Sequence, residues 1–151
     1  MEEREINRLL QNQANFQGTF AVNEVNEIDV KRIPALAIIN LGDRKSDGSH
    51  WIGIAVYLKT IFVCDSLGGL LPTKQFPFEL TNFLGQLAKT RKLVVSNQLQ
   101  HTSSGSCGLF AVAFVQQMSL NNSFFDFICC FSRNLVQNDT IVKFLLAKRK
   151  I

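Results

Sequence analysis

The chain has 151 residues, of which 46% are hydrophobic and 19% are charged. This composition is typical of a folded protein and excludes an intrinsically disordered chain. No apolar run reaches the roughly 18 residues that a membrane-spanning helix needs, and the charged start MEEREINRLL is unlike a secretory signal. The length predicts one domain over residues 1–151.

The net charge is +4, and basic residues gather in short clusters at 31–32, 44–45, 89–92 and 147–150. Such clusters can contact nucleic acid, but a solvated basic surface has the same composition. The four cysteines lack the paired C-x2-C spacing of a zinc site, so no metal is expected. We expect free thiols in a reducing compartment.

The spacing of apolar residues predicts the secondary structure in chain order. The expected elements are a helix over 2–13, a turn or short extended piece over 16–20, a strand over 35–40, a hairpin of strands over 50–58 and 60–65, a helix over 76–89, a strand over 92–95, and helices over 108–115, 122–131 and 135–150. Composition predicts a loop over 41–49 and a turn over 67–72. Asn138 or Asp139 is expected to cap the last helix. Helices and strands in this order indicate the α+β class.

The stretch LQHTSSGSCGLFAVAF, residues 99–114, changes from a Ser-rich run into an apolar helix at Cys107. A helix N-terminus stabilises a thiolate, and Gly108 lets backbone approach closely beside it. A nucleophile next to a backbone N–H is what acyl transfer needs. The alternative is that Cys107 is only a small apolar residue at the start of a core helix.

A cysteine nucleophile also needs a base, and the chain contains two histidines. His50 begins a predicted strand beside Trp51, whereas His101 lies in the Ser-rich loop. Because a strand end holds a side chain more rigidly than a loop does, His50 is the better candidate for the base. The alternatives are that both histidines lie on the surface and that Trp51 belongs to the core.

An acidic residue and an amide complete the candidate site. Asp65 ends the strand that pairs with the strand of His50, in an apolar setting where a carboxylate needs a partner. It is therefore suited to orient the imidazole. Gln100 precedes Cys107 by seven residues and can offer a side-chain N–H to an oxyanion. The alternatives are that Asp65 only begins a turn and that Gln100 is an ordinary loop residue.

The order and spacing of these residues resemble the adenain type of cysteine protease, which comprises adenovirus maturation proteases and is related to the proteases of ubiquitin-like proteins. The residues that carry the resemblance are His50, Trp51, Asp65, Gln100, Cys107, Gly108, Leu109 and Phe110, together with NFQGTF at 15–20 and the approach to His50 from Ala37. The seven-residue interval between the glutamine and the cysteine is that of adenain. The similarity extends from about residue 5 to about residue 120.

This resemblance implies a papain-like or adenain-like single domain, with a central mixed sheet and the nucleophile at the N-terminus of a buried helix. It implies a triad of Cys107, His50 and Asp65, with the oxyanion held by the Cys107 backbone and Gln100, and with Gly108 and Trp51 supporting the site. It also implies an endopeptidase that cleaves Gly-containing sites in viral capsid and core precursors during virion maturation, in the virion and the host nucleus.

The resemblance further implies DNA and an activating peptide as cofactors. The adenain cysteine that forms a disulfide with the peptide has no counterpart in KTRKLVVS at 89–96. A disulfide-linked peptide is therefore not expected here, whereas a non-covalent peptide is compatible with the sequence. Two further departures from adenain are Asp65 in place of glutamate and Ser66 in place of proline.

Two other functions remain open from the sequence. One is a protease of ubiquitin-like (SUMO-type) modifiers, which has the same catalytic set. The other is a catalytically silent, nucleic-acid-associated virion protein on the same fold. In each case Cys64, Cys129 and Cys130 are expected to lie in the core and to be dispensable for chemistry.

Overall fold

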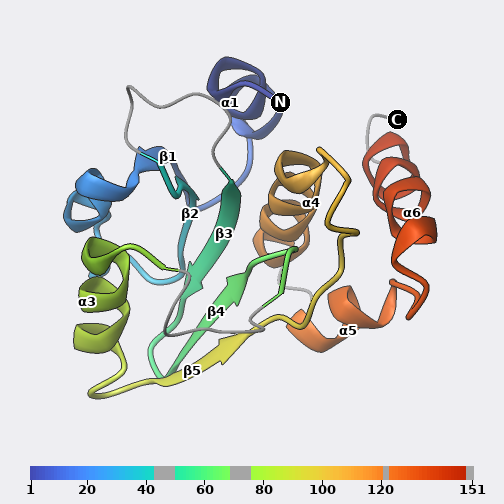
Figure 1. Cartoon of the computed structure of the whole chain (residues 1–151). Helices are drawn as coiled ribbons and strands as arrows, with labels where there is room; N and C mark the ends of the chain where they lie inside the picture. The colour runs from blue at the N-terminus through green and yellow to red at the C-terminus, as the bar shows by residue number, and fades with distance from the viewer. Residues whose placement is uncertain (43–49, 69–75, 121–122, 149–151) are drawn as a thin grey trace.

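A five-stranded mixed sheet forms the centre of the computed structural model, which describes residues 1–42, 50–68, 76–120 and 123–148 (Figure 1). The strands are β1 (Phe16–Ala21), β2 (Ala35–Asn40), β3 (Trp51–Val56), β4 (Thr60–Cys64) and β5 (Lys92–Val95), and they lie side by side in chain order. The two outer pairs are parallel, and the two inner pairs are antiparallel. The predicted α+β class and central mixed sheet are confirmed.

Helices cover both faces of this sheet (Figure 1). The 3-10 helix η1 (Val22–Glu27) and α3 (Phe78–Leu87) pack on one face, and α1 (Glu3–Leu10), α4 (Cys107–Ser119), α5 (Phe124–Cys129) and α6 (Leu135–Ala147) lie on the other side. Each side has its own apolar core. No helix in the described ranges is long and apolar enough to cross a membrane.

Strand β3 is buried along its whole length because it contributes to both cores. Side chains of a strand alternate between the two faces of the sheet. Ile52 and Ile54 accordingly pack towards η1 and α3, whereas Trp51 and Ala55 pack towards α4. Gly53 lies opposite Phe114 of α4, with no side chain between them. This double burial explains why the sequence of β3 is continuously apolar.

Helix α4 is apolar on nearly all sides because it lies between the sheet and three other helices, α1, α5 and α6. Phe110, Phe114 and Val115 are fully buried in it, and the helix contacts strands β2 and β3 as well as α1 and α6. An amphipathic surface helix would show one polar face. The buried helix expected from the sequence is therefore confirmed, and it begins at Cys107.

Residues 16–20, expected as a turn or a short extended piece, are extended and belong to strand β1. The pairing of β1 with β2 is irregular beside Gly18, a glycine with φ of 125°. Two other local predictions were wrong. Helix η1 was not predicted. Asn134 is the N-cap of α6, and Asn138 and Asp139 lie inside that helix. The expected loop over 41–49 and turn over 67–72 fall largely outside the described residues.

Cys129 and Cys130 are exposed rather than buried in the core, whereas Cys64 is buried as expected. Helix α5 is short and turns Phe124 and Phe127 towards the core, so its last residues lie at the surface. None of the four cysteines, all within the described residues, forms a disulfide.

Substituting Gly53→Ala should destabilise the protein by about 1–3 kcal/mol, the usual range for an overpacked core. The added Cβ would overlap the ring of Phe114, including Cε1 at 3.0 Å. Gly85→Ala in α3 is the matched control, because its Cβ would meet nothing within 4 Å. Urea unfolding of both variants should show a lower midpoint for Gly53→Ala and an equal or higher midpoint for Gly85→Ala. Equal midpoints would contradict the tight packing of β3 on α4.

Candidate active site

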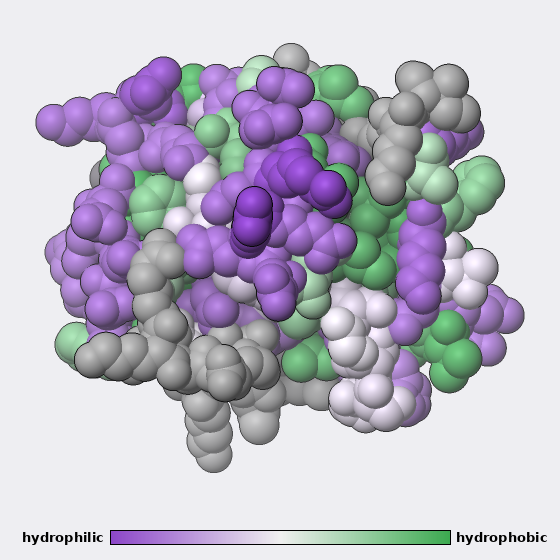
Figure 2. Space-filling model, turned by 90° about the horizontal axis from the view of Figure 1, so that it is seen from above, coloured by the Kyte–Doolittle hydropathy of each residue, from purple (hydrophilic) through white to green (hydrophobic). Residues whose placement is uncertain are grey.

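Candidate residues lie at or next to the ends of three elements, β3, β4 and α4, which are labelled in Figure 1. Cys107 is the first residue of α4. His50 immediately precedes β3, and Asp65 immediately follows β4. Because the two strands are antiparallel and Gly53 pairs with Cys64, the start of β3 lies beside the end of β4. Seen from above in Figure 2, the molecule is predominantly hydrophilic.

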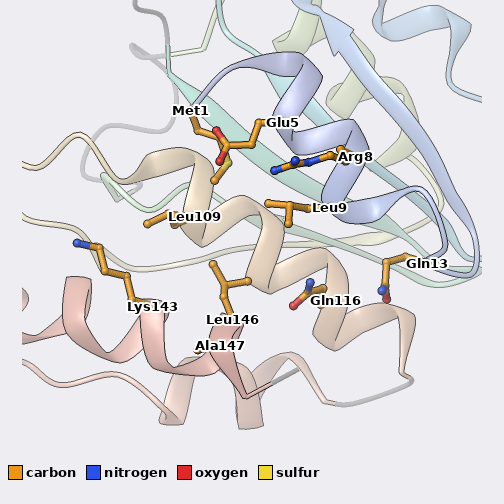
Figure 3. A pocket seen from close by; sticks show the side chains of 10 residues that line it. All are labelled: Met1, Glu5, Arg8, Leu9, Gln13, Leu109, Gln116, Lys143, Leu146 and Ala147. Carbon is orange, nitrogen blue, oxygen red and sulfur yellow. The ribbon is translucent and has the colours of Figure 1, made fainter. Parts of the chain in front are cut away.

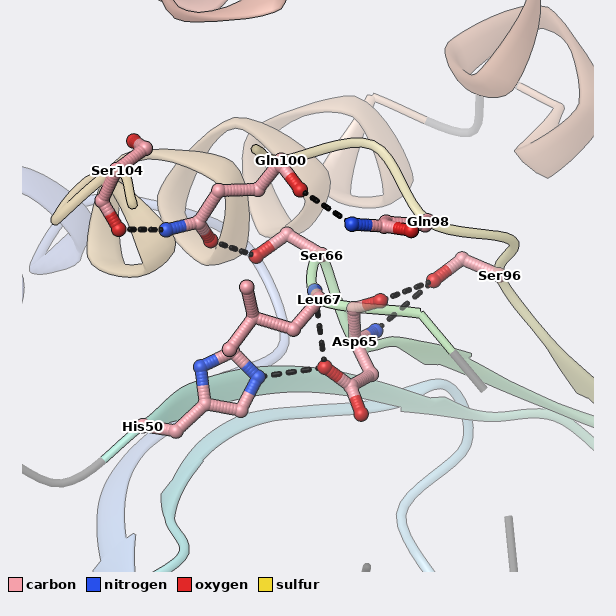
Figure 4. A network of polar contacts seen from close by, with 8 residues as sticks. All are labelled: His50, Asp65, Ser66, Leu67, Ser96, Gln98, Gln100 and Ser104. Carbon is pink, nitrogen blue, oxygen red and sulfur yellow. Dashed lines mark hydrogen bonds and ion pairs between the residues drawn. The ribbon is translucent and has the colours of Figure 1, made fainter. Parts of the chain in front are cut away.

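His50 and Asp65 are in direct contact. The Nε2 atom of His50 lies 2.5 Å from Oδ1 of Asp65, whose side chain is almost fully buried (Figure 4). The same Oδ1 accepts the backbone N–H of Leu67 at 3.2 Å. Ser96 fixes the backbone of Asp65, because its hydroxyl accepts the Asp65 N–H and donates to the Asp65 carbonyl, each at 2.9 Å. Nε2 therefore carries the proton that faces the carboxylate.

The other ring nitrogen of His50, Nδ1, is buried and makes no hydrogen bond within the described part of the chain. His50 also interacts with Cys107, the first residue of α4. Burial lowers the pKa of His50, but the hydrogen bond to Asp65 and the interaction with Cys107 outweigh it and raise the pKa to about 9. His50 is therefore expected to be an imidazolium at neutral pH.

The pKa of Cys107 shifts in the complementary direction. Burial raises it, but the interaction with His50 and the backbone N–H groups of Trp51 and Gly108 lower it, with a net pKa below that of an ordinary cysteine. A thiol with a lowered pKa beside a histidine with a raised pKa favours the thiolate–imidazolium pair. This arrangement can carry out nucleophilic chemistry on a carbonyl carbon.

Gln100 lies almost fully buried in the loop before α4, and both ends of its amide are held (Figure 4). Its Oε1 accepts the hydroxyl of Ser66 at 2.6 Å, and its Nε2 donates to the carbonyl of Ser104, also at 2.6 Å. Because a carbonyl only accepts hydrogen bonds, Ser104 identifies the nitrogen end of the amide. An amide nitrogen has two N–H groups, so one remains to bind a negative oxygen.

Trp51 and Gly108 contact the first residue of the chain. The Trp51 indole N–H donates to the Met1 carbonyl at 3.1 Å, and its side chain is largely buried. A Cβ on Gly108 would lie 2.9 Å from the Cβ of Met1. His101, in contrast, is exposed and its Nδ1 pairs with the hydroxyl of Ser103 at 2.6 Å, so it lies outside this arrangement.

Sequence reasoning missed the serines that hold the site. Ser66, Ser96 and Ser104 are single residues in turns and loops, and no local pattern distinguishes them from solvent-exposed serines. Their partners are up to 35 residues away in the sequence. Of the three, only Ser66 was noticed in the sequence, because it replaces a proline of adenain.

A cavity of about 320 Å³ lies between α1, α4 and α6 (Figure 3). Leu9, Leu109 and Leu146 provide apolar walls, and Arg8 and Lys143 add charge. None of the candidate catalytic residues lines it. The polar cluster at the ends of β3, β4 and α4 is therefore the better candidate for the catalytic centre.

The chain is similar to known proteins over most of its length. A family model described as adenovirus endoprotease matches residues 16–129. The protease of bovine adenovirus 7 is 34% identical over 128 residues, which cover 76% of this chain and 63% of that protein. The protease of frog adenovirus 1 is 31% identical over 112 residues, covering 68% of this chain and 54% of that protein. The chain thus spans less than two thirds of the length of these relatives.

Solved structures extend the likeness to the fold. The central domain of the uncharacterized Lpg1148 protein from Legionella pneumophila has a TM-score of 0.51 and 14% identity, covering 98% of this chain and 95% of that one. A structure of the SUMO protease Ulp1 has a TM-score of 0.47 and 15% identity, covering 97% of this chain and 75% of that one.

The pKa directions predict how iodoacetamide alkylates Cys107 as pH changes. The pair of Cys107 thiolate and His50 imidazolium is present above the lowered pKa of Cys107 and below the pKa of His50 near 9. Alkylation should therefore persist on the acid side of an ordinary thiol profile and decline only when the thiolate takes up a proton. Mass spectrometry of the modified peptides measures the profile.

In the same experiment His50→Ala should shift the Cys107 profile towards higher pH. The exposed Cys129 is an internal reference thiol, and its profile should be the same in both proteins. Burial raises the pKa of the Cys64 thiol, so Cys64 should remain unmodified in the folded protein. A Cys107 profile that does not respond to His50→Ala would contradict the interaction between these two residues.

Proposed function

The chain belongs to the adenovirus endoprotease family, and from this premise we propose that it is a cysteine endopeptidase with Cys107, His50 and Asp65 as its catalytic triad. The observation that carries the proposal is the contact of 2.5 Å between His50 and Asp65 beside a cysteine with a lowered pKa. These three groups have the chemistry of nucleophile, base and orienting acid.

In the proposed mechanism, the Cys107 thiolate attacks the carbonyl carbon of the scissile peptide bond. The negative oxygen that forms is bound by the Cys107 backbone N–H and by the remaining side-chain N–H of Gln100. The first N–H groups of a helix lack carbonyl partners within it, so the Cys107 N–H is suited to this role. As the C–N bond breaks, Nδ1 of His50 gives its proton to the leaving amine.

The resulting thioester is then hydrolysed. Nδ1 of His50, now without its proton, takes one from a water molecule, and the hydroxide attacks the thioester carbonyl. The C–S bond breaks, the carboxylic product leaves, and the thiolate and imidazolium are restored. Throughout, Asp65 holds the proton on Nε2 and so keeps Nδ1 directed at the reacting atoms.

The proposed substrates are Gly-containing sites in viral capsid and core precursors, cleaved during virion maturation in the virion and the host nucleus. The support is family membership together with adenovirus proteases as the matching relatives. Glycine near the cleaved bond suits a narrow cleft. Non-specific DNA and a non-covalent activating peptide are proposed cofactors, consistent with the basic net charge of +4.

The two alternatives have less support. A protease of ubiquitin-like modifiers would have the same triad, but the family that matches is the adenovirus endoprotease. A catalytically silent virion protein would not require the shifted pKa values of Cys107 and His50. A fluorogenic ubiquitin-like conjugate, assayed beside Gly-containing peptides, distinguishes the first alternative from the proposal.

Cleavage of Gly-containing peptides should be abolished in Cys107→Ala and nearly abolished in His50→Ala. Gln100→Ala should lower kcat by about 10²–10³, the usual loss for one oxyanion donor. Cys129→Ala is the matched control, because this exposed cysteine lies outside the proposed site, and it should retain full activity. The assay is run with and without double-stranded DNA and candidate precursor peptides. Cleavage by the Cys107→Ala protein would rule out the assignment.

A further inference from the structure

Two neighbouring residues of α6 bind the loop that contains Gln100, one just before Gln100 and one just after it. Asn138 is fully buried, and its side-chain N–H donates to the Leu99 carbonyl at 2.8 Å. Asp139 accepts the hydroxyl of Ser104 at 2.7 Å. The loop is therefore fastened to α6 just before Gln100 and again four residues after it.

Ser104 connects Asp139 to the amide of Gln100. Its hydroxyl donates to Asp139, and its carbonyl accepts the Nε2 of Gln100 at 2.6 Å (Figure 4). The hydroxyl oxygen also accepts the backbone N–H of Ser106 at 3.2 Å, next to the first residue of α4. The position of the Ser104 carbonyl decides where the nitrogen of the Gln100 amide lies, and Asp139 holds the residue that supplies this carbonyl.

We propose that Asp139 is a positioning residue for the oxyanion-binding amide of Gln100 and that it acts through Ser104. The effect of Asp139 on catalysis rests on the proposed function, whereas the structural link from Asp139 through Ser104 to Gln100 does not. Asn138 and Asp139 lie beyond residues 16–129, which match the family model. The C-terminal helix of this chain thus contributes to the site from outside the matched region.

The hydrogen bonding of Asp139 supports this role. One carboxylate oxygen, Oδ2, accepts the hydrogen bond from Ser104, while the other, Oδ1, is buried and has no partner among the described residues. A charged acceptor forms a stronger hydrogen bond than a neutral one, which suits a group that fixes the position of a loop.

The first test separates oxyanion binding from thiolate formation. Asp139→Ala should lower kcat by about tenfold, less than the roughly 10²–10³ expected for loss of the donor itself, with KM unchanged. The pH profile of Cys107 alkylation should not change, because iodoacetamide reacts without forming an oxyanion on a carbonyl. Asp139→Asn keeps an acceptor and should retain most of the activity. Thr140→Ala, at the adjacent exposed position of α6, is the matched control.

The second test asks whether Asp139 acts through Ser104. Ser104→Ala should reproduce the loss of kcat, and adding Asp139→Ala to it should cause little further loss, since coupled residues are not additive. Losses that multiply in the double variant would overturn the link. A changed Cys107 alkylation profile in Asp139→Ala would also overturn it, because the effect would then reach the whole site.

The third test measures the Gln100 amide directly and does not require the protein to cleave a peptide. The full chain is labelled with ¹⁵N-glutamine, and the side-chain NH2 signals of Gln100 are identified by their loss in Gln100→Glu. Exchange of these protons with water should be slow in the unsubstituted protein and faster in Asp139→Ala. In Thr140→Ala it should be as slow as in the unsubstituted protein. Unchanged exchange in Asp139→Ala would overturn the inference. Faster exchange in a chain that cleaves no peptide would support the link and count against the proposed function alone.

Discussion

The contact between His50 and Asp65 determines how the rest of the site is arranged. Because Nε2 of His50 is committed to a buried carboxylate at 2.5 Å, Nδ1 is the nitrogen left for Cys107. Burial lowers the pKa of the imidazole, but this contact and the interaction with Cys107 together raise it to about 9, and the interaction with His50 in turn lowers the pKa of the thiol. The tautomer, the charge state and the direction of proton transfer therefore all depend on one hydrogen-bonded pair.

The fold supplies this pair through two paired strands of the central sheet. Asp65 follows β4 and His50 precedes β3; the two strands pair in a defined register, and β3 is buried along its whole length. Cys107 begins a helix that is packed between the sheet and other helices. A catalytic arrangement on strand and helix ends is held more rigidly than one on loops. Gln100 lies instead in a loop, which is fastened by Ser66 and by Asn138 and Asp139 of α6.

The sequence was sufficient to predict elements that have a local pattern of residues. It was also sufficient to predict site residues that follow one another in a characteristic order. The β-branched residues of β3 and β4 predicted the hairpin, and the uniformly apolar stretch after Cys107 predicted α4. The order from His50 to Cys107 indicated the family, and the family match confirmed it. The structure brings His50 and Asp65 together, and the catalytic roles of these residues remain predictions.

Features that depend on distant partners were not predictable in this way. Helix η1 was missed because Val22 and Val25 are separated by polar residues, although both are buried. Asp139 looked like a helix cap, yet its partner Ser104 is 35 residues away. The cysteines of α5 were placed in the core because phenylalanines surround them, but only one side of this short helix faces inwards. In each case tertiary packing decides the outcome, and local composition does not carry that information.

The most direct test of the central claim is an NMR titration of the His50 ring between pH 5 and pH 10. We predict that His50 stays protonated through neutral pH and loses its proton near pH 9, and the exposed His101 gives a second histidine signal in the same spectra. Cys107→Ala should lower the pKa of His50, because the interaction with the thiolate is removed. A pKa of His50 close to the ordinary 6.5, unchanged by Cys107→Ala, would contradict the thiolate–imidazolium pair and the mechanism built on it.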